Sequence, residues 1–187
     1  MRTVRIAIIG AGFAGVGMAT RLKQAGITDF EILERAADIG GTWRDNGYPG
    51  CAVDVQSHLY SFSFAPNPNW SRVYAPQAEI WDYLRRVAEE HGVLQHVRLN
   101  HNVLGGDWDD VDQHWVLRTS QGPVRAQFVI SGMGPLSTPR PPDIPGLDSF
   151  AGRQFHSAAW DHDYDLTGKG VAVIGTGSSA AQFIPEI

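Results

Sequence analysis

The sequence lacks the features that mark secreted, membrane-spanning and nucleic-acid-binding proteins. Its 187 residues include one cysteine, Cys51, so no intramolecular disulfide can form and a cytoplasmic setting is expected. No apolar run approaches the ~18 residues of a membrane span. The chain has fifteen Lys and Arg residues and twenty Asp and Glu residues, which give a net charge of −5. The basic residues form no stripe, so neither nucleic acid nor a membrane is an expected partner.

What the sequence does contain is the composition of a folded domain. Hydrophobic residues make up 43% of the chain and charged residues 19%, which is typical of a globular protein with a core. Residues 1–19 combine two arginines with a small apolar run, as a signal peptide does. Their glycines, however, have a regular spacing that favours a nucleotide-binding turn.

The first thirty-odd residues predict a strand, a turn, a helix and a second strand. Val4–Ile9 is apolar and rich in β-branched residues, as in a strand buried in a parallel sheet. GAGFAG follows at 10–15, and a helical stretch then runs to Gln24 before Gly26. Asp29–Leu33 has the pattern of the next strand. This unit predicts an α/β fold.

The G-x-G-x-x-G spacing in this setting indicates a dinucleotide site. Gly10 allows the tight turn, Gly12 lets the backbone approach a pyrophosphate, and Gly15 lets helix and strand pack closely. Glu34, at the end of the second strand, is placed to bind ribose hydroxyls, and its charge favours FAD or NAD over NADP. The candidate cofactor-binding residues here are Gly10, Gly12, Phe13, Ala14, Gly15, Glu34 and Arg35.

The middle of the chain predicts one helix and three strands. Pro76–His91 is amphipathic, with an apolar face made of Ile80, Trp81, Leu84, Val87 and Ala88. Residues 97–105, 114–120 and 124–131 have strand patterns, and the last leads into a second glycine turn, GMG, at 132–134.

A second fingerprint lies near the C-terminus. Gly170–Ile174 has a buried-strand pattern, and the turn after it supplies further candidate cofactor-binding residues, namely Gly175, Thr176, Gly177, Ser178 and Ser179. The stretch up to Ile187 is shorter than the ~30 residues of a complete unit, so we expect the N-terminal part of a longer protein. Two such turns in series predict a two-cofactor flavoprotein.

Prolines at 135, 139, 141, 142 and 145 indicate a stiff linker between the two predicted dinucleotide folds. The expected organisation is therefore a flavin-binding domain at 1–134, a proline-rich linker at 135–168, and the start of a second dinucleotide-binding domain at 169–187.

Two further motifs carry a family resemblance. The first is GGTWRDNGYPGCAVDVQSHLYSFSF at 40–64, with its Gly40–Trp43, Tyr48–Gly50, Asp54, Ser57 and Tyr60. The second follows F-x-G-x-x-x-H-x-x-x-W-[PD] and comprises Phe150, Gly152, His156, Trp160 and Asp161. Together they resemble the class B flavoprotein monooxygenases, and among these the Baeyer–Villiger monooxygenases. Arg44–Gly47 departs from the YWNR of many members, which leaves the ketone substrate open.

The resemblance implies a fold and a reaction. The fold is a Rossmann-like FAD-binding domain of the three-layer ββα type, followed by the start of a second Rossmann NADP-binding domain. In the reaction NADPH reduces FAD, O₂ adds to give a C4a-peroxyflavin, and attack on a ketone yields an ester or lactone. The implied partners are a small ketone, O₂ and a missing C-terminal segment that completes the site.

The resemblance also assigns residues. Asp54 is the expected catalytic residue, close to flavin and nicotinamide. Val103 resembles a position whose backbone meets the adenine, and His156 a linker residue that couples domain movement to cofactor position. The expected flavin contacts are Gly41, Thr42, Trp43 and Tyr60.

Other interpretations of the same residues stay open. Asp54 also suits a turn cap, Trp43 a core aromatic, and His156 a surface residue. The remaining histidines show no metal-ligand spacing, so no metal is expected. The alternatives in function are an N- or S-oxygenating flavin monooxygenase, against which Trp160–Asp161 argues, and a catalytically silent FAD-binding fragment. The isolated chain is expected to be inactive.

Overall fold

The computed structural model describes residues 1–187, whose contacts divide the chain into two compact units. Unit 1 comprises Met1–Arg44 and Trp81–Pro135, and unit 2 comprises Asp45–Ile80 and Leu136–Ile187. No helix in either unit is long and apolar enough to cross a bilayer.

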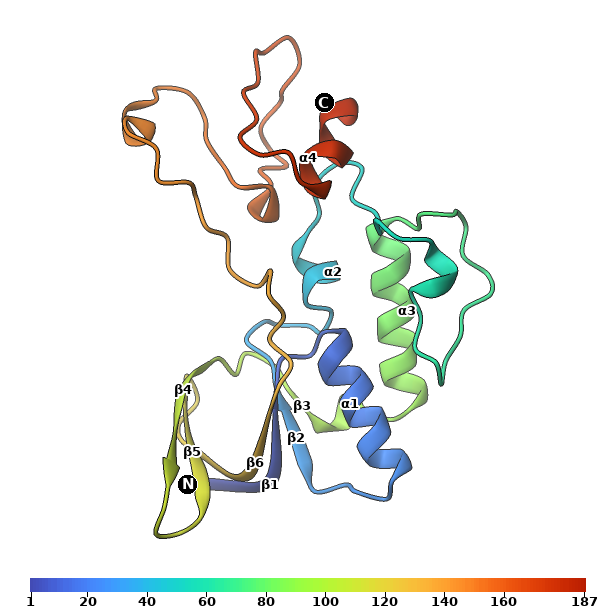
Figure 1. Ribbon diagram of the computed structural model, residues 1–187, viewed down its shortest axis with the longest axis vertical. Helices are drawn as coiled ribbons and strands as arrows, with labels where there is room; N and C mark the ends of the chain where they lie inside the picture. The colour runs from blue at the N-terminus through green and yellow to red at the C-terminus, as the bar shows by residue number, and fades with distance from the viewer. The chain divides into compact units, whose positions relative to one another are not determined.

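Unit 1 contains one six-stranded sheet in the order β3-β2-β1-β6-β5-β4 (Figure 1). The first four strands of this order run parallel, and β5 and β4 complete the sheet in antiparallel pairing. Ile8 of β1 lies between Ile32 and Ile130, which is the register expected of a central strand with neighbours on both edges. The strands are β1 (Arg2–Ile9), β2 (Phe30–Leu33), β3 (Val97–Arg98), β4 (Val103–Asp109), β5 (His114–Thr119) and β6 (Val124–Ser131).

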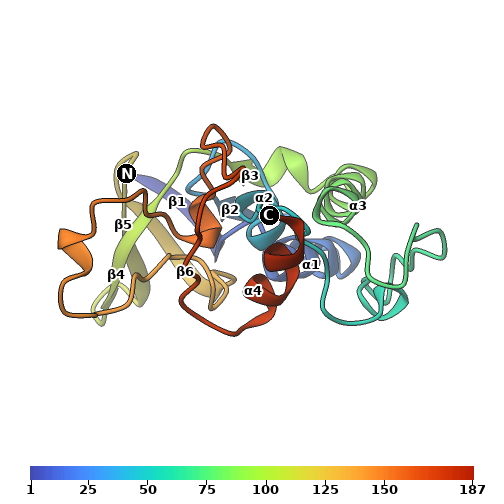
Figure 2. The same cartoon turned by 90° about the horizontal axis from the view of Figure 1, so that it is seen from above.

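The chain has four α-helices, namely α1 (Phe13–Gln24), α2 (Thr42–Asp45), α3 (Gln77–Glu90) and α4 (Ser178–Phe183), and α4 belongs to unit 2. Figures 1 and 2 place α1 on one side of the parallel strands, away from the β4–β5 edge. In the predicted apolar face of α3, Ile80, Leu84, Val87 and Ala88 are confirmed as fully buried, whereas Trp81 is only partly buried. The predicted α/β class is likewise confirmed.

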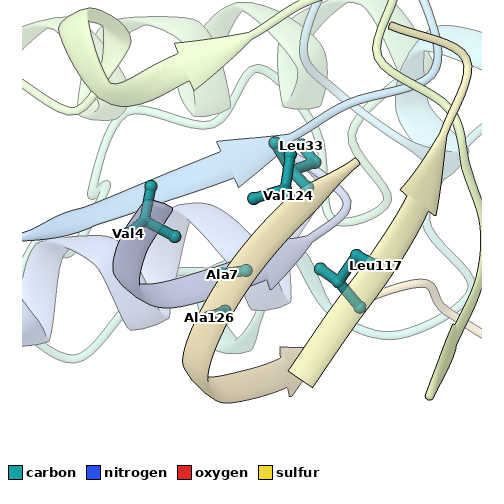
Figure 3. Close-up of a cluster of buried hydrophobic side chains, with 6 residues drawn as sticks. All are labelled: Val4, Ala7, Leu33, Leu117, Val124 and Ala126. Atoms are coloured by element: carbon teal, nitrogen blue, oxygen red, sulfur yellow. The ribbon is translucent and has the colours of Figure 1, made fainter. Parts of the chain in front are cut away.

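A core cluster joins four strands of unit 1 (Figure 3). Its six buried residues come from β1, β2, β5 and β6, and Val103 and Val129 pack against them. Two members of the cluster are small, Ala7 of β1 and Ala126 of β6, which leaves room for the larger apolar side chains packed beside them. The cluster members are Val4, Ala7, Leu33, Leu117, Val124 and Ala126.

Two strand predictions need correction. The run 97–105 is not one strand but contains the whole of β3 and the start of β4, and Asn100 between them has a left-handed φ of 55°. The stretch Gly170–Ile174 is neither a strand nor buried, since Val171 and Ile174 are exposed. A strand needs a neighbour for its N–H and C=O groups, and all six strands lie within residues 2–131.

Candidate functional site

The turn from β1 into α1 is built so tightly that it admits only glycine at two places. Gly10 has φ +96°, and a Cβ there would lie 2.8 Å from the Gly132 carbonyl oxygen. A Cβ on Gly15 would lie 1.9 Å from the Gly10 carbonyl oxygen. The Gly132 N–H donates to the Ile9 carbonyl oxygen at 2.8 Å, so the GMG turn at 132–134 lies against the turn from β1 into α1. The sequence predicted a turn at 132–134, but it did not predict that this turn lies beside Gly10.

The N-terminus of α1 has the properties of an anion site. Gly12 is its N-cap, no side chain caps it, and no acidic residue stands in its first turn. The positive end of the helix dipole is therefore not neutralised by the chain itself. Gly41, with φ +54°, comes so close that a Cβ on it would lie 3.2 Å from the Gly12 Cα. The structure thus brings the predicted residues Gly12 and Gly41 together.

Glu34 lies buried beside the same turn. Its Oε2 accepts the Ala11 N–H at 2.8 Å, and its Oε1 accepts the Ala36 N–H at 3.0 Å. Arg44 donates to Oε1 at 3.0 Å and to the Asp38 carbonyl at 2.5 Å. These bonds hold the carboxylate at the end of β2. Sequence reasoning gave Arg44 no role, because nothing in the local pattern showed that it would reach Glu34.

The other predicted residues of unit 1 have ordinary structural contacts. The Phe13 ring stacks on Tyr83 with centroids 6.1 Å apart. Trp43 is buried in α2, and Val103 packs on the core at the start of β4. Arg35 is exposed. The cofactor roles assigned to these residues, and to Ala14 and Thr42, stay predictions.

In unit 2 the structure joins residues of two different motifs. Ser178, in the second fingerprint, donates its hydroxyl to Asp54 Oδ2 at 2.8 Å. Sequence reasoning did not identify Ser178 as a partner of Asp54. Gly175 takes φ +125°, and Gly177 is the N-cap of α4. Tyr60 lies half-buried after the short 3-10 helix η1 (Ser57–Leu59).

An apolar cluster packs α4 against the segment that leads to Asp54. Tyr48, Ala180 and Phe183 are buried in it, and Cys51, Trp160 and Val173 pack against them. Burial raises the pKa of the Cys51 thiol, which favours the neutral form, so Cys51 packs as an apolar group and is not an activated nucleophile.

The residues of the second family motif also have structural partners in unit 2. Trp160 lies against Phe183 with ring centroids 5.1 Å apart. Arg153 donates to Asp161 at 2.5 and 2.8 Å. His156 Nδ1 accepts the Ala158 N–H at 3.1 Å and caps the 3-10 helix η4 (Ser157–Ala159). The cap requires an unprotonated Nδ1.

The buried Tyr48 predicts a loss of stability in alkali. Burial is the main cause that raises the pKa of Tyr48 from 10.0 to about 12. Because the unfolded chain gives up this proton first, the stabilisation is complete below pH 10 and lost as pH rises toward 12. Urea unfolding across pH 9–12 should show this decline, and Tyr48→Phe should remove part of it. An equal decline in both proteins would contradict the assignment.

One cluster with metal-ligand chemistry lies on the β4–β5 hairpin. Asp109, Asp112 and His114 bring their ligand atoms within 4.8 Å of one another. Arg125 donates to His114 Nε2 at 2.5 Å and to Asp112 at 2.7 Å. A cation would have to displace this guanidinium, so the cluster has the character of an ion-pair network.

The comparisons with known proteins cover almost the whole chain. The profile of the pyridine nucleotide-disulphide oxidoreductases matches residues 7–184. A Baeyer–Villiger monooxygenase of Streptomyces coelicolor is 56% identical over 184 residues, covering 98% of this chain and 36% of that protein. One of Pseudomonas aeruginosa is 54% identical over 187 residues, covering 100% and 36%.

A solved structure agrees with these relatives. The complex of OTEMO with FAD and NADP superposes with a TM-score of 0.88 at 38% identity, covering 97% of this chain and 36% of that one. The chain therefore spans about a third of the length of the relatives that it matches.

Proposed function

Because the chain belongs to the pyridine nucleotide-disulphide oxidoreductase family, we propose that it is the FAD-binding N-terminal part of a Baeyer–Villiger monooxygenase. The complete enzyme would use NADPH and O₂ to convert a small ketone into an ester or lactone in the cytoplasm. The observation that carries this proposal is identity of 54–56% with two Baeyer–Villiger monooxygenases over almost the whole chain.

The first glycine turn fits the pyrophosphate of FAD. The approach of Gly41 to Gly12 leaves backbone, without side chains, beside the N-terminus of α1. An anion there would meet the positive end of the helix dipole. The close backbone contacts of Gly10, Gly15 and Gly132 keep that turn in one shape.

Glu34 keeps capacity for a ribose hydroxyl. A carboxylate offers about four acceptor positions, and three are taken by Ala11, Ala36 and Arg44. Two of these three bonds go to Oε1, so the remaining position is on Oε2. When bound, FAD would supply the redox chemistry that the side chains of this chain lack.

Asp54 is proposed as the residue that takes part in the chemistry, as a carboxylate oriented by Ser178. The second turn, from Gly175 to Ser179, is proposed to hold the nicotinamide cofactor. That assignment rests on its spacing and on the left-handed Gly175.

Flavin content tests the proposal first. The purified chain should bind added FAD, seen in its absorbance spectrum and in flavin released by denaturation, and a Gly12→Asp variant should not. Gly170→Ala is the matched control, since a Cβ there meets nothing within 4 Å. Absence of flavin from the wild-type chain, even with FAD in excess, would contradict the proposal.

Asp54→Asn separates binding from chemistry. Asparagine keeps an oxygen for Ser178 but loses the charge, so flavin content should stay and ketone-dependent NADPH oxidation in the complete protein should fall by about 100-fold. Product analysis by mass spectrometry distinguishes an ester from an N- or S-oxide. We expect no turnover by the 187 residues alone, since the relatives are much longer.

A further inference from the structure

We infer that Gln182 is a positioning residue that fixes the segment Tyr48–Asp54 to α4 and thereby holds Asp54. The inference deepens the proposed function, because it rests on the role given there to Asp54. Gln182 belongs to neither of the two glycine fingerprints and to neither of the two family motifs.

The side-chain amide of Gln182 forms hydrogen bonds with both the backbone N–H and the backbone carbonyl of Ala52. Its Nε2 donates to the Ala52 carbonyl at 2.8 Å, and its Oε1 accepts the Ala52 N–H at 3.4 Å. The same Oε1 accepts the Tyr48 hydroxyl at 3.0 Å. Gln182 thus takes the place that a neighbouring strand would have beside Ala52, although the two residues are 130 positions apart.

The backbone approach at this contact is close. Gly50 takes φ +70°, and a Cβ on it would lie 2.6 Å from the Gln182 carbonyl oxygen. The rings of Tyr48 and Phe183 meet edge to face with centroids 6.1 Å apart. The segment therefore packs against α4 in one register, with Gln182 at its centre.

Two backbone hydrogen bonds hold the other side of the segment. Val53 donates its N–H to the Ala75 carbonyl at 3.0 Å, and the Cys51 carbonyl accepts the Gln77 N–H at 2.9 Å. Beyond these, Asp54 itself has the hydrogen bond from Ser178, and both of those residues are exposed to solvent. Because water competes for an exposed hydrogen bond, the partly buried amide of Gln182 is the stronger restraint.

This arrangement links the two motifs that the proposed reaction needs. Gln182 lies in α4, the helix that begins at the second fingerprint (175–179), and Ala52 lies two residues before Asp54. A shift of α4 would therefore carry the Asp54 carboxylate with it. Small displacements of a reacting group cost a large part of the rate, so Gln182 should affect turnover more than binding.

The test compares Gln182→Met, which keeps the length but removes the amide, with Gln182→Glu. Glutamate keeps the acceptor for Tyr48 but loses the donor to Ala52 and sets a carboxylate beside that carbonyl. Gln24→Met, at an exposed position in α1, is the matched control. Hydrogen exchange of residues 48–54 should quicken about tenfold in both Gln182 variants and stay unchanged in the control.

In the complete flavin-loaded protein, both Gln182 variants should lower kcat about tenfold or more with flavin content and the KM for NADPH nearly unchanged. Unchanged exchange at 48–54, or a loss of flavin together with a general loss of protection, would overturn the inference. If the wild-type chain binds no FAD, the proposed function fails, and the exchange result still decides whether Gln182 holds the segment.

Discussion

The Gly15→Ala variant is expected to lose flavin binding and about 3 kcal/mol or more of its free energy of unfolding. The added methyl would lie 1.9 Å from the Gly10 carbonyl oxygen and 3.0 Å from its carbon. Both atoms belong to the backbone, so no side chain can turn aside to make room. Gly10 cannot retreat either, because it is already close to Gly132. Urea unfolding and flavin release measure the two effects.

The control for this prediction is Gly170→Ala, whose methyl has no neighbour within 4 Å and whose backbone is not left-handed. Its free energy of unfolding should stay within about 0.5 kcal/mol of the wild-type value. A Gly15→Ala protein that matched the control in both stability and flavin content would show that helix α1 can shift away from β1.

Glu34→Ala is expected to lower the free energy of unfolding by about 3–5 kcal/mol and to weaken flavin binding. The substitution leaves the N–H groups of Ala11 and Ala36 without their acceptor. It also removes the carboxylate that pairs with the guanidinium of Arg44, whose side chain is 12% exposed. A buried ion pair that loses one partner costs more than the pair contributed, because the remaining charge stays desolvated.

A double-mutant cycle separates these causes. The double variant Glu34→Ala/Arg44→Leu should lose less free energy of unfolding than the two single variants lose together. The difference, the coupling free energy, should be about 1–3 kcal/mol. Glu90→Gln is the control, because Glu90 and Arg86 form an exposed helix pair worth about 0.5 kcal/mol. Strict additivity in the cycle would mean that Arg44 and Glu34 do not act as a pair.

Prediction from sequence succeeded where the determinant was local. The apolar pattern placed β1 and α3 within two residues of their observed ends, and the predicted end of α1 at Gln24 is confirmed, although α1 begins at Phe13, inside the glycine fingerprint. It failed at Gly170–Ile174, whose apolar pattern is that of a buried strand, because a strand forms only when another strand pairs with it. It also merged β3 with β4, since no local signal marked the left-handed turn at Asn100.

The sequence by itself determined the glycine turn of β1 and α1, the acidic residue at the end of β2, and the family motifs, because each depends on neighbours a few residues away or on spacing. The tertiary structure alone decided which distant groups meet: Gly132 with Gly10, Arg44 with Glu34, and α4 with the segment before Asp54. Those contacts join segments that are separated along the chain, so they form only when the tertiary fold brings the segments together. No local periodicity encodes them.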